Sequence, residues 1–260
     1  MRIAIITGAS SGMGKEFVKK VDSLNLDGIW GIALDDEGLN KVKHEINTPF
    51  VSLSMDLTKT ESFEEIKKML IQNKPQVEIL INCSGFGKFG RYDDLKTDSV
   101  LNMIDLNCKA LVHLTELVLP FMPDGSRIAQ FASIAGFQPV PYINVYAATK
   151  AFVISYSRAL NIELKPRKIS VTCICPFWTK TAFFDRAVNQ QNKVITYYAV
   201  MYDANKVINK AFKDLLKRKE ISIYGFIANA QAKLVKILPH KLVMRVWCNQ
   251  QKFNKLYNKK

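Results

Sequence analysis

Membrane-spanning and secretory segments are missing from this 260-residue chain. No apolar run reaches the roughly 18 residues that a spanning helix needs. The start, MRIAIITGAS, has no basic segment, long apolar segment or small-residue cleavage site that would mark export. Internal repeats and low-complexity linkers are also missing. Because 48% of the residues are hydrophobic, we expect one catalytic-sized unit with a substantial core, located in the cytoplasm.

Cysteines are few and form no recognisable pattern. Their number is odd and they are scattered along the chain: Cys83, Cys108, Cys173, Cys175 and Cys248. Most lie in apolar segments, which is typical of reduced, buried thiols. Cys173 and Cys175 share one face of an expected strand, but no second pair lies nearby to complete a zinc site. We therefore expect no metal.

Acidic residues are missing after Glu220, and the whole chain has a net charge of +14. The last segment, 228–260, mixes apolar residues with eight basic ones: Lys233, Lys236, Lys241, Arg245, Lys252, Lys255, Lys259 and Lys260. A basic amphipathic extension of this kind can lie on an anionic membrane, cover a substrate cleft, or simply pack on one face. Packing is favoured, peripheral membrane contact comes next, and no nucleic-acid partner is expected.

Short apolar runs alternate with helical patterns along the remainder of the chain. The runs predict seven strands, at 2–7, 29–34, 50–54, 77–82, 126–133, 169–175 and 221–225. The helical patterns lie at 12–24, 37–46, 60–72, 99–121, 145–164 and 204–219. This alternation predicts a single α/β domain over residues 1–227, built on a doubly wound parallel sheet. Two segments, 85–98 and 176–200, interrupt the alternation just after strands, so we expect them to face a substrate.

A glycine-rich loop, TGASSGMG at 7–14, joins the first expected strand to the first helix. Glycines allow a tight turn close to a pyrophosphate, and a helix N-terminus supplies unpaired N–H groups. Within a βαβ unit, this placement is typical of a dinucleotide-binding, Rossmann-type domain. A turn without a ligand is the alternative. No Gly-Lys-Ser/Thr follows the last glycine, which disfavours ATP hydrolysis.

Four polar residues are candidates for catalysis. Tyr146 and Lys150 lie four residues apart on an expected helix and share a face. A cation a few ångströms away stabilises a phenolate by roughly 1–4 kcal/mol, which would let the phenol exchange a proton. Ser133, at the end of the fifth expected strand, can hydrogen-bond a carbonyl oxygen. Asn107 lies in an apolar helix, where its amide needs a hydrogen-bond partner. We expect that partner to be local, either the backbone or an ordered water. Singly, each also suits an ordinary structural role.

In this combination and order, these motifs resemble the short-chain dehydrogenase/reductase family, with similarity from Ile3 to about Tyr224. The resemblance implies that Tyr146 donates or accepts the proton and that Ser133 orients the substrate oxygen. It implies that Lys150 lowers the tyrosine pKa and holds the nicotinamide ribose, while Asn107 sustains a water relay. The implied cofactor contacts are Gly8, Ser10, Ser11, Gly12, Met13, Gly14, Asp35, Asp56, Leu57, Asn82, Ser84, Gly85, Tyr146, Lys150, Pro176 and Thr181. Asp56 and Leu57 correspond to the family's adenine-binding pair, and Thr181 to its carboxamide contact.

The chain departs from the family pattern in three places. Residues 82–85 are Asn-Cys-Ser-Gly where many relatives have Asn-Asn-Ala-Gly, and Phe177 follows Pro176 where a glycine is usual. After the second strand, Asp35, Asp36 and Glu37 replace the arginines that grip a 2′-phosphate in some relatives. Acidic groups repel phosphate and accept ribose hydroxyls, so NAD(H) is favoured over NADP(H).

The expected reaction is hydride transfer between a ketone and a secondary alcohol. Aromatic and aliphatic residues near the site suggest an apolar substrate, such as a steroid or a lipid. The expected pocket walls are Phe86, Phe89, Phe137, Val140, Tyr142, Phe177, Trp178 and Phe183. The alternative function is a catalytically weak nucleotide-binding protein that senses redox state or acts as a scaffold. Helices 99–121 and 145–164 are expected to support a homodimer or homotetramer.

Overall fold

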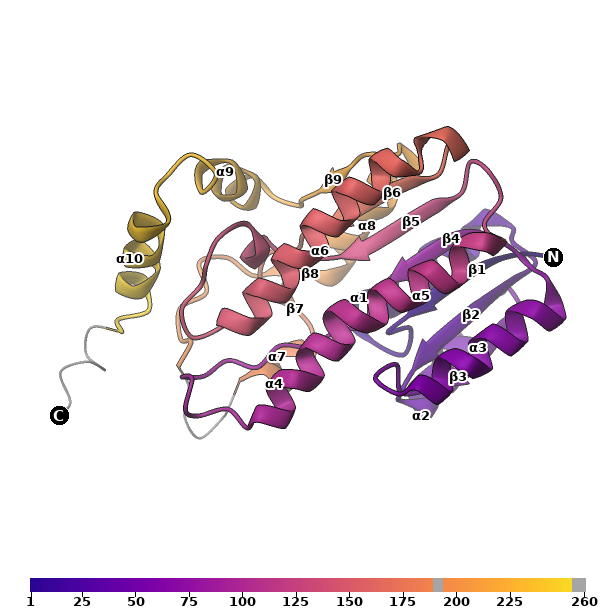
Figure 1. Cartoon of the computed structure of the whole chain (residues 1–260), viewed down its shortest axis with the longest axis horizontal. Helices are drawn as coiled ribbons and strands as arrows, with labels where there is room; N and C mark the ends of the chain where they lie inside the picture. Colours follow the sequence, from indigo (N-terminus) through magenta and orange to yellow (C-terminus); the bar gives the residue numbers. More distant parts are fainter. Residues whose placement is uncertain (189–193, 254–260) are drawn as a thin grey trace.

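The computed structural model describes residues 1–188 and 194–253, which fold into three layers, with a sheet between two layers of helices (Figure 1). The middle layer is a parallel sheet of seven strands. They are β1 (Arg2–Thr7), β2 (Gly28–Ala33), β3 (Phe50–Ser54), β4 (Gln76–Asn82), β5 (Arg127–Phe131), β6 (Ser170–Ile174) and β9 (Ile221–Ser222). Their order across the sheet is β3-β2-β1-β4-β5-β6-β9. The predicted doubly wound parallel sheet is confirmed.

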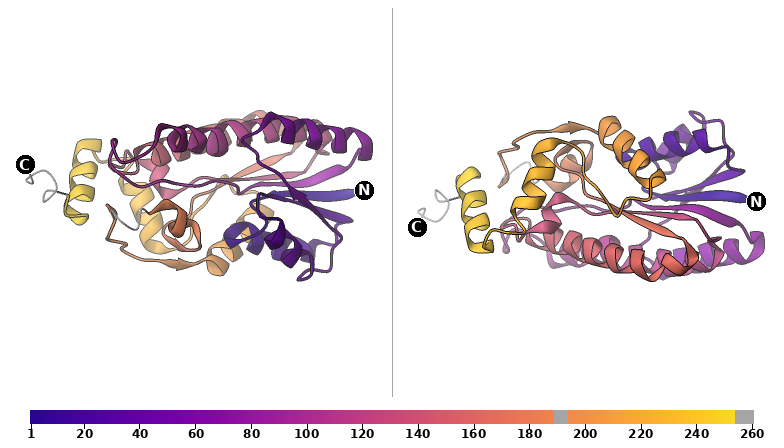
Figure 2. Two further views of the ribbon diagram at one scale, coloured as in Figure 1. Left: turned by 90° about the horizontal axis from the view of Figure 1, so that it is seen from below. Right: turned by 90° about the horizontal axis from the view of Figure 1, so that it is seen from above.

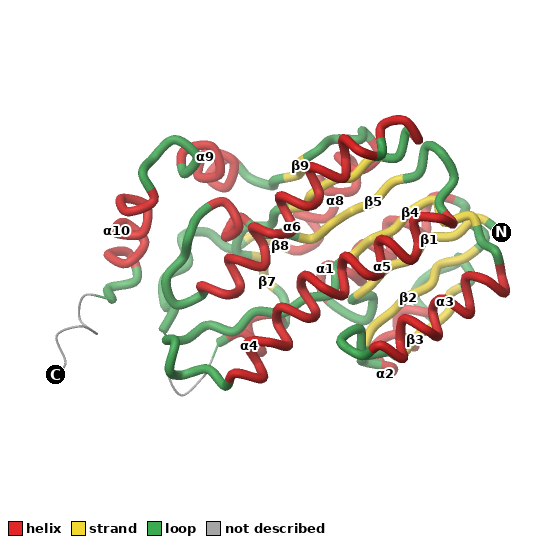
Figure 3. Tube along the Cα trace, viewed as in Figure 1, coloured by secondary structure: helices red, strands yellow, loops and turns green. Residues whose placement is uncertain are grey.

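Helices cover both faces of the sheet (Figures 2 and 3). One face packs against α3 (Thr60–Asn73), α5 (Leu111–Val118) and α6 (Asn144–Glu163). The other packs against α1 (Gly12–Val21), α2 (Asp36–Lys43) and α8 (Ala204–Leu216). Strand β1 shows why the central strands are apolar throughout. Ile3 and Ile5 enter the first core and Ala4 and Ile6 the second, because successive side chains point to opposite faces.

Strand β1 lies between β2 and β4, where the order of connections reverses. The loops that follow β1 and β4 therefore diverge to opposite faces of the sheet and leave a crevice at its carboxyl edge. Open α/β sheets bind ligands at such a switch point. The glycine loop follows β1, so the fold alone places it there.

The helix predicted at 99–121 is divided into four parts. It comprises α4 (Thr97–Ile104), a π-helical turn (Asp105–Ala110), α5 and a short 3₁₀ turn (Leu119–Phe121). A π-helical turn inserts an extra residue into the ladder and is often found at functional sites. Asn107 lies within it and is fully buried.

Three strands are shorter than predicted. β5 ends at Phe131, and Ser133 precedes a 3₁₀ turn (Ile134–Phe137) instead of closing the strand. β6 lacks one predicted residue at each end. β9 has only two residues and pairs with β6 at the edge of the sheet.

The two segments that interrupt the alternation contact each other. Phe89 bridges to Val188, and its N–H donates to the carbonyl of Ala187 at 2.9 Å. The second segment contains β7 (Thr179–Lys180) and α7 (Phe183–Ala187), and β7 pairs with β8 (Tyr202–Asp203). Residues 189–193 of this segment lie outside the described part.

The segment that follows β9 is helical and packed as far as residue 253, the last one described. α9 (Phe226–Leu234) and α10 (His240–Gln250) follow β9, so the boundary predicted between residues 227 and 228 falls inside α9. The extension therefore begins at Phe226, where the helix starts. Residues 254–260 lie outside the described part. Within 1–188 and 194–253, no helix is both long and apolar enough to span a bilayer.

Candidate active site

The glycine loop makes a sharp turn from β1 into α1. Gly8 and Gly12 have φ angles of +67° and +52°, in the left-handed region that favours glycine. A Cβ at Gly14 would lie 2.0 Å from the carbonyl oxygen of Gly8, so only glycine permits this closure. Ser11 does not cap α1 through its side chain, and the first turn has no acidic residue. The loop and helix terminus thus present N–H groups and a partial positive charge.

Two threonines hold this loop in place. Thr7, at the end of β1, accepts hydrogen bonds from the N–H groups of Cys83 and Ser84, both at 2.9 Å. The methyl group of Thr181 would lie 3.6 Å from a Cβ on Gly12, so the 176–200 segment lies against the loop. Thr7 was not among the predicted residues. A hydroxyl at the end of an otherwise apolar strand is the signal that could have identified it.

Asn82, predicted as a cofactor contact, also forms hydrogen bonds within the protein. Its side chain is buried, and its amide nitrogen donates to Thr115 at 2.9 Å and to Gln130 at 3.0 Å. Gln130 also donates to Thr115. This network joins β4 and β5 to α5, so the structure places Asn82 in the supporting core.

The acidic end of β2 lies beside the glycine loop. Asp35 is exposed and caps α2, accepting the N–H of Gly38 at 3.0 Å. A Cβ on Gly38 would lie 2.3 Å from Asp35 Oδ2 and 2.8 Å from the Ser10 Cβ, so Asp35 and the loop flank the same point. Beyond β3, Asp56 accepts the N–H and hydroxyl of Thr58. The side chain of Leu57 packs into the core.

The Asn107 side chain both donates a hydrogen bond to the main chain of Phe86 and accepts one from it. Its Nδ2 donates to the Phe86 carbonyl at 2.9 Å, and its Oδ1 accepts the Phe86 N–H at 3.0 Å. Nδ2 also donates to Thr149 Oγ1 at 3.1 Å. The prediction that this amide needs a local backbone partner is confirmed. The π-helical turn widens the helix at this position, and Asn107 thereby fixes the loop that follows β4.

Ser133 occupies the N-terminus of the 3₁₀ turn after β5. Its Oγ accepts the N–H of Ala135 at 3.2 Å and lies 3.5 Å from the carbonyl of Pro176, to which it donates. The turn packs directly on α6, because a Cβ on Gly136 would lie 2.6 Å from the carbonyl carbon of Lys150. The distance between Ser133 and the catalytic helix is therefore set by a glycine that the sequence did not single out.

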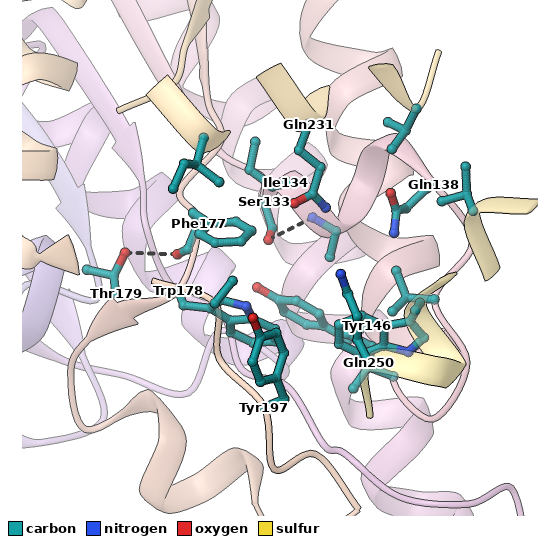
Figure 4. A pocket seen from close by; sticks show the side chains of 18 of the residues that line it. Ser133, Ile134, Gln138, Tyr146, Phe177, Trp178, Thr179, Tyr197, Gln231 and Gln250 are labelled. Carbon is teal, nitrogen blue, oxygen red and sulfur yellow. Dashed lines mark hydrogen bonds between the residues drawn. The ribbon is translucent and has the colours of Figure 1, made fainter. Parts of the chain in front are cut away.

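Tyr146 and Lys150 lie on one face of α6, as predicted. The Lys150 Nζ lies 5.7 Å from the centre of the Tyr146 ring and donates to the Phe131 carbonyl at 2.8 Å. Figure 4 shows the hydroxyls of Ser133 and Tyr146 facing the same space. The structure therefore brings Ser133, Tyr146 and Lys150 together at the ends of β5 and β6, with Asn107 behind them.

Burial governs the titration of both groups. Desolvation raises the pKa of Tyr146 to about 12, and hydrogen bonding with Ser133 opposes that rise. Desolvation lowers the pKa of Lys150 to about 8, while the charges of nearby thiols, first that of Cys83, oppose it. The resemblance implies that Lys150 lowers the tyrosine pKa. The pKa of Tyr146 is raised, and the first cause of that rise is desolvation.

A cavity of about 530 Å³ opens directly above Ser133 and Tyr146. Of the predicted walls, the ones that line it are Phe89, Val140, Phe177, Trp178 and Phe183. Phe86, Phe137 and Tyr142 are not among its lining residues. Phe177 occupies the position where glycine is usual and packs against Trp178 and Tyr202. The bulky ring therefore contributes to the pocket wall, and the cavity is mainly apolar.

Much of the remaining wall comes from the C-terminal extension. α9 contributes Phe226, Ile227, Ala230, Gln231 and Leu234, and α10 contributes Val243, Val246, Trp247 and Gln250. Trp247 is fixed by a hydrogen bond from its indole N–H to the Pro141 carbonyl at 3.0 Å, and it stacks on Trp178. The described part of this segment therefore covers one side of the cavity, which is one of the three interpretations left open for it.

Metal chemistry has no visible basis in this site. In the part of the chain that the structure describes, no three His, Cys, Asp or Glu side chains are grouped so as to hold an ion.

Comparison with known proteins agrees with this geometry. Residues 2–192 match the family described as short chain dehydrogenase. An uncharacterized oxidoreductase of Staphylococcus epidermidis is 29% identical over 177 residues, which cover 67% of this chain and 76% of that protein. A probable short-chain type dehydrogenase/reductase of Helicobacter pylori is 28% identical over 234 residues, covering 85% of this chain and 81% of the relative.

Among solved structures, a short-chain dehydrogenase from Sphingobium yanoikuyae in complex with NADPH superposes with a TM-score of 0.77. It is 25% identical, and the match covers 92% of this chain and 97% of that one.

Proposed function

The chain belongs to the short-chain dehydrogenase family, and on that premise we propose that it interconverts an apolar ketone and a secondary alcohol by nicotinamide-dependent hydride transfer. The observation that carries this proposal is the convergence of Ser133, Tyr146 and Lys150 beneath an apolar cavity, next to the glycine loop.

The residues present fit a dinucleotide. The glycine loop and the α1 terminus would hold the pyrophosphate through N–H groups, since no side chain or acidic residue competes for them. Asp35 and Asp56 would lie toward the adenosine half, and Lys150 and Thr181 toward the nicotinamide half. When bound, the nicotinamide would supply or accept the hydride.

Side chains of this protein would donate and accept the proton that the reaction requires. In ketone reduction, Ser133 would hold the carbonyl oxygen while Tyr146 donates its phenolic proton to that oxygen. The phenolate left behind is costly in a buried site, and the Lys150 ammonium would offset part of that cost. Asn107 would act at a distance, because it positions the loop at Phe86 rather than the substrate.

We propose NAD(H) as the preferred cofactor. Asp35 and its acidic neighbours would repel a 2′-phosphate and accept a ribose hydroxyl. The Sphingobium relative was solved with NADPH, so both cofactors belong in the assay.

We also propose that the protein is a homodimer or homotetramer. The outer faces of α4 and α6 carry exposed apolar side chains, among them Leu101, Ile104 and Phe152. Sedimentation of Phe152→Glu against the wild type would test this, with a smaller species expected for the variant. Equal sizes, or a monomeric wild type, would reject this interface.

A panel of apolar ketones and alcohols tests the main proposal, with NADH and NADPH oxidation followed by absorbance. We expect turnover with the wild-type chain and a loss of at least a hundredfold in Tyr146→Phe. Turnover that survives in Tyr146→Phe would remove the tyrosine from its role. Cofactor binding without turnover across the panel would instead favour the redox-sensing or scaffold alternative.

A further inference from the structure

The C-terminal helices present large apolar side chains to solvent. We use "α9–α10 surface" for Phe226, Ile227, Leu234, Ile237, Leu242 and Val246, all of which are exposed. Phe226 and Ile237 are 87% and 82% exposed, which is unusual for side chains of this size. These residues fall within 21 positions and lie at the end of the molecule opposite the N-terminus (Figure 2).

This surface belongs to packed helices, not to an unfolded tail. Ala228, Ala232 and Val243 on the same helices are buried. Asn229 donates to the carbonyls of Ile223 and Gly225, which fixes the start of α9. The six apolar side chains are therefore exposed on helices whose other residues are held in place, some at the mouth of the cavity and others, Ile237 and Leu242, outside it.

The charges around the surface have one sign. Lys233, Lys236, Lys241 and Arg245 are exposed on the same two helices and the turn between them. No acidic residue follows Glu220. Apolar residues bordered by cations, with no anion among them, complement a surface that is apolar inside and anionic at its edge.

The pocket opens on this surface. Phe226, Ile227, Leu234 and Val246 are exposed and also line the cavity that contains Ser133 and Tyr146. An apolar molecule leaving the α9–α10 surface would therefore meet apolar side chains along its path to the catalytic hydroxyls.

We propose that the α9–α10 surface docks on bilayers that contain anionic lipid, so that the pocket opens onto the membrane. Its apolar residues would enter the interfacial region, while the lysine and arginine stems extend along them to the headgroups. Delivery of a substrate from the bilayer rests on the function proposed above, whereas docking itself does not.

Vesicle co-sedimentation of the full chain tests docking. We expect binding to phosphatidylcholine mixed with phosphatidylglycerol, weaker binding to phosphatidylcholine alone, and a decline as salt rises. Ile237→Ser with Leu242→Ser should weaken binding at least tenfold. Ile71→Ser with Ile162→Ser, equally exposed on α3 and α6, is the matched control and should bind normally.

Substitution of two lysines tests the electrostatic contribution to vesicle binding. Lys236→Gln with Lys241→Gln should weaken binding to anionic vesicles about 25-fold, at roughly fivefold for each cation. Lys67→Gln with Lys68→Gln, on α3, should have no effect. Equal sedimentation of wild type and both α9–α10 variants, or none with anionic vesicles, would overturn the proposal. A wild-type oligomer that Ile237→Ser with Leu242→Ser dissociates would also overturn it, because a second copy would then cover the surface.

Measurements of enzyme turnover distinguish a failure of the docking proposal from a failure of the proposed function. Ile237 and Leu242 do not line the cavity, so that variant should reduce a water-soluble ketone at the wild-type rate. It should lose activity only on a long-chain ketone presented in anionic vesicles. Equal loss on both substrates would assign the effect to the fold and overturn the docking interpretation.

Discussion

The amide of Asn107 and the main chain of Phe86 form one hydrogen bond in each direction, at 3.0 and 2.9 Å. The side chain is fully buried, so neither group can exchange its partner for water. A residue that both donates and accepts is therefore required at this position.

Asn107→Asp tests that requirement. Aspartate retains the acceptor for the Phe86 N–H but places a carboxylate against the Phe86 carbonyl. We expect a loss of about 2–4 kcal/mol in the free energy of unfolding, measured by denaturant titration, together with lower kcat/KM. Asn102→Asp, exposed on the same helix, is the control. A normal stability in Asn107→Asp would contradict the assigned hydrogen bonding.

Ketone reduction should weaken as pH rises through about 8. The pKa of Lys150 is lowered to about 8 by burial, so its ammonium is lost above that pH and no longer stabilises the Tyr146 phenolate. The expected result is a falling limb of kcat/KM near pH 8. In Lys150→Arg, whose cation persists to high pH, the residual activity should lack that limb. A limb shared by both proteins would assign it to another group.

Lys150→Met should abolish activity and yet stabilise the fold at pH 7. The lysine pKa falls from 10.5 unfolded to about 8 folded, so below pH 8 folding pays the cost of burying a cation. That cost is about 3 kcal/mol, partly offset by the hydrogen bond to Phe131, which leaves an expected gain of about 1–2 kcal/mol.

The sign of this effect depends on pH. The gain should shrink between pH 8 and 10.5 and vanish above it, where lysine is neutral in both states. Thermal and denaturant unfolding at pH 7 and pH 10 measure it. A variant that is less stable at pH 7 would show that the ammonium contributes net stability.

Gly136→Ala should lower the rate of catalysis because it changes the distance between α6 and the 3₁₀ turn that carries Ser133. Its Cβ would lie 2.6 Å from the main chain of Lys150, so the turn carrying Ser133 must move away from α6. We expect a loss of about 1–3 kcal/mol in stability and lower kcat with little change in cofactor binding. Gly28→Ala, whose Cβ would meet its nearest neighbour at 3.5 Å, is the matched control. Similar kinetics for both variants would contradict this role.

Asp35→Asn should relax the preference for NADH. Asparagine still caps α2 through its oxygen, so the substitution removes the charge and leaves the helix intact. We expect the ratio of kcat/KM for NADPH to that for NADH to rise about fivefold, since one charge repulsion near the surface is worth about 1 kcal/mol. Asp98→Asn, a carboxylate on α4, is the control. An unchanged ratio in Asp35→Asn would place the selectivity elsewhere.

The sequence predicted the fold well because its signals are local. Strands buried on both faces, such as residues 3–6 of β1, are apolar without interruption, and the glycine loop marks the first βα turn. The same reasoning identified Ser133, Tyr146, Lys150 and Asn107, each through a motif.

Contacts between segments that lie far apart in the sequence were harder to predict. Thr7 meets Cys83 across 76 residues, and Trp247 meets Pro141 across 106. Neither pairing leaves a pattern within one element. Asn82 shows a further limit of motifs, because the motif gave no sign of the buried network that its amide nitrogen forms with Thr115 and Gln130.

The helices that close the pocket follow every candidate catalytic residue in the sequence, and that order matters during synthesis. The glycine loop, Asn107, Ser133, Tyr146 and Lys150 have all been translated before Phe226 is added. A nascent chain at that stage carries the candidate catalytic residues without the part of the pocket wall that α9 and α10 supply. The contacts that these two helices offer a substrate are therefore added after the residues proposed to act on it.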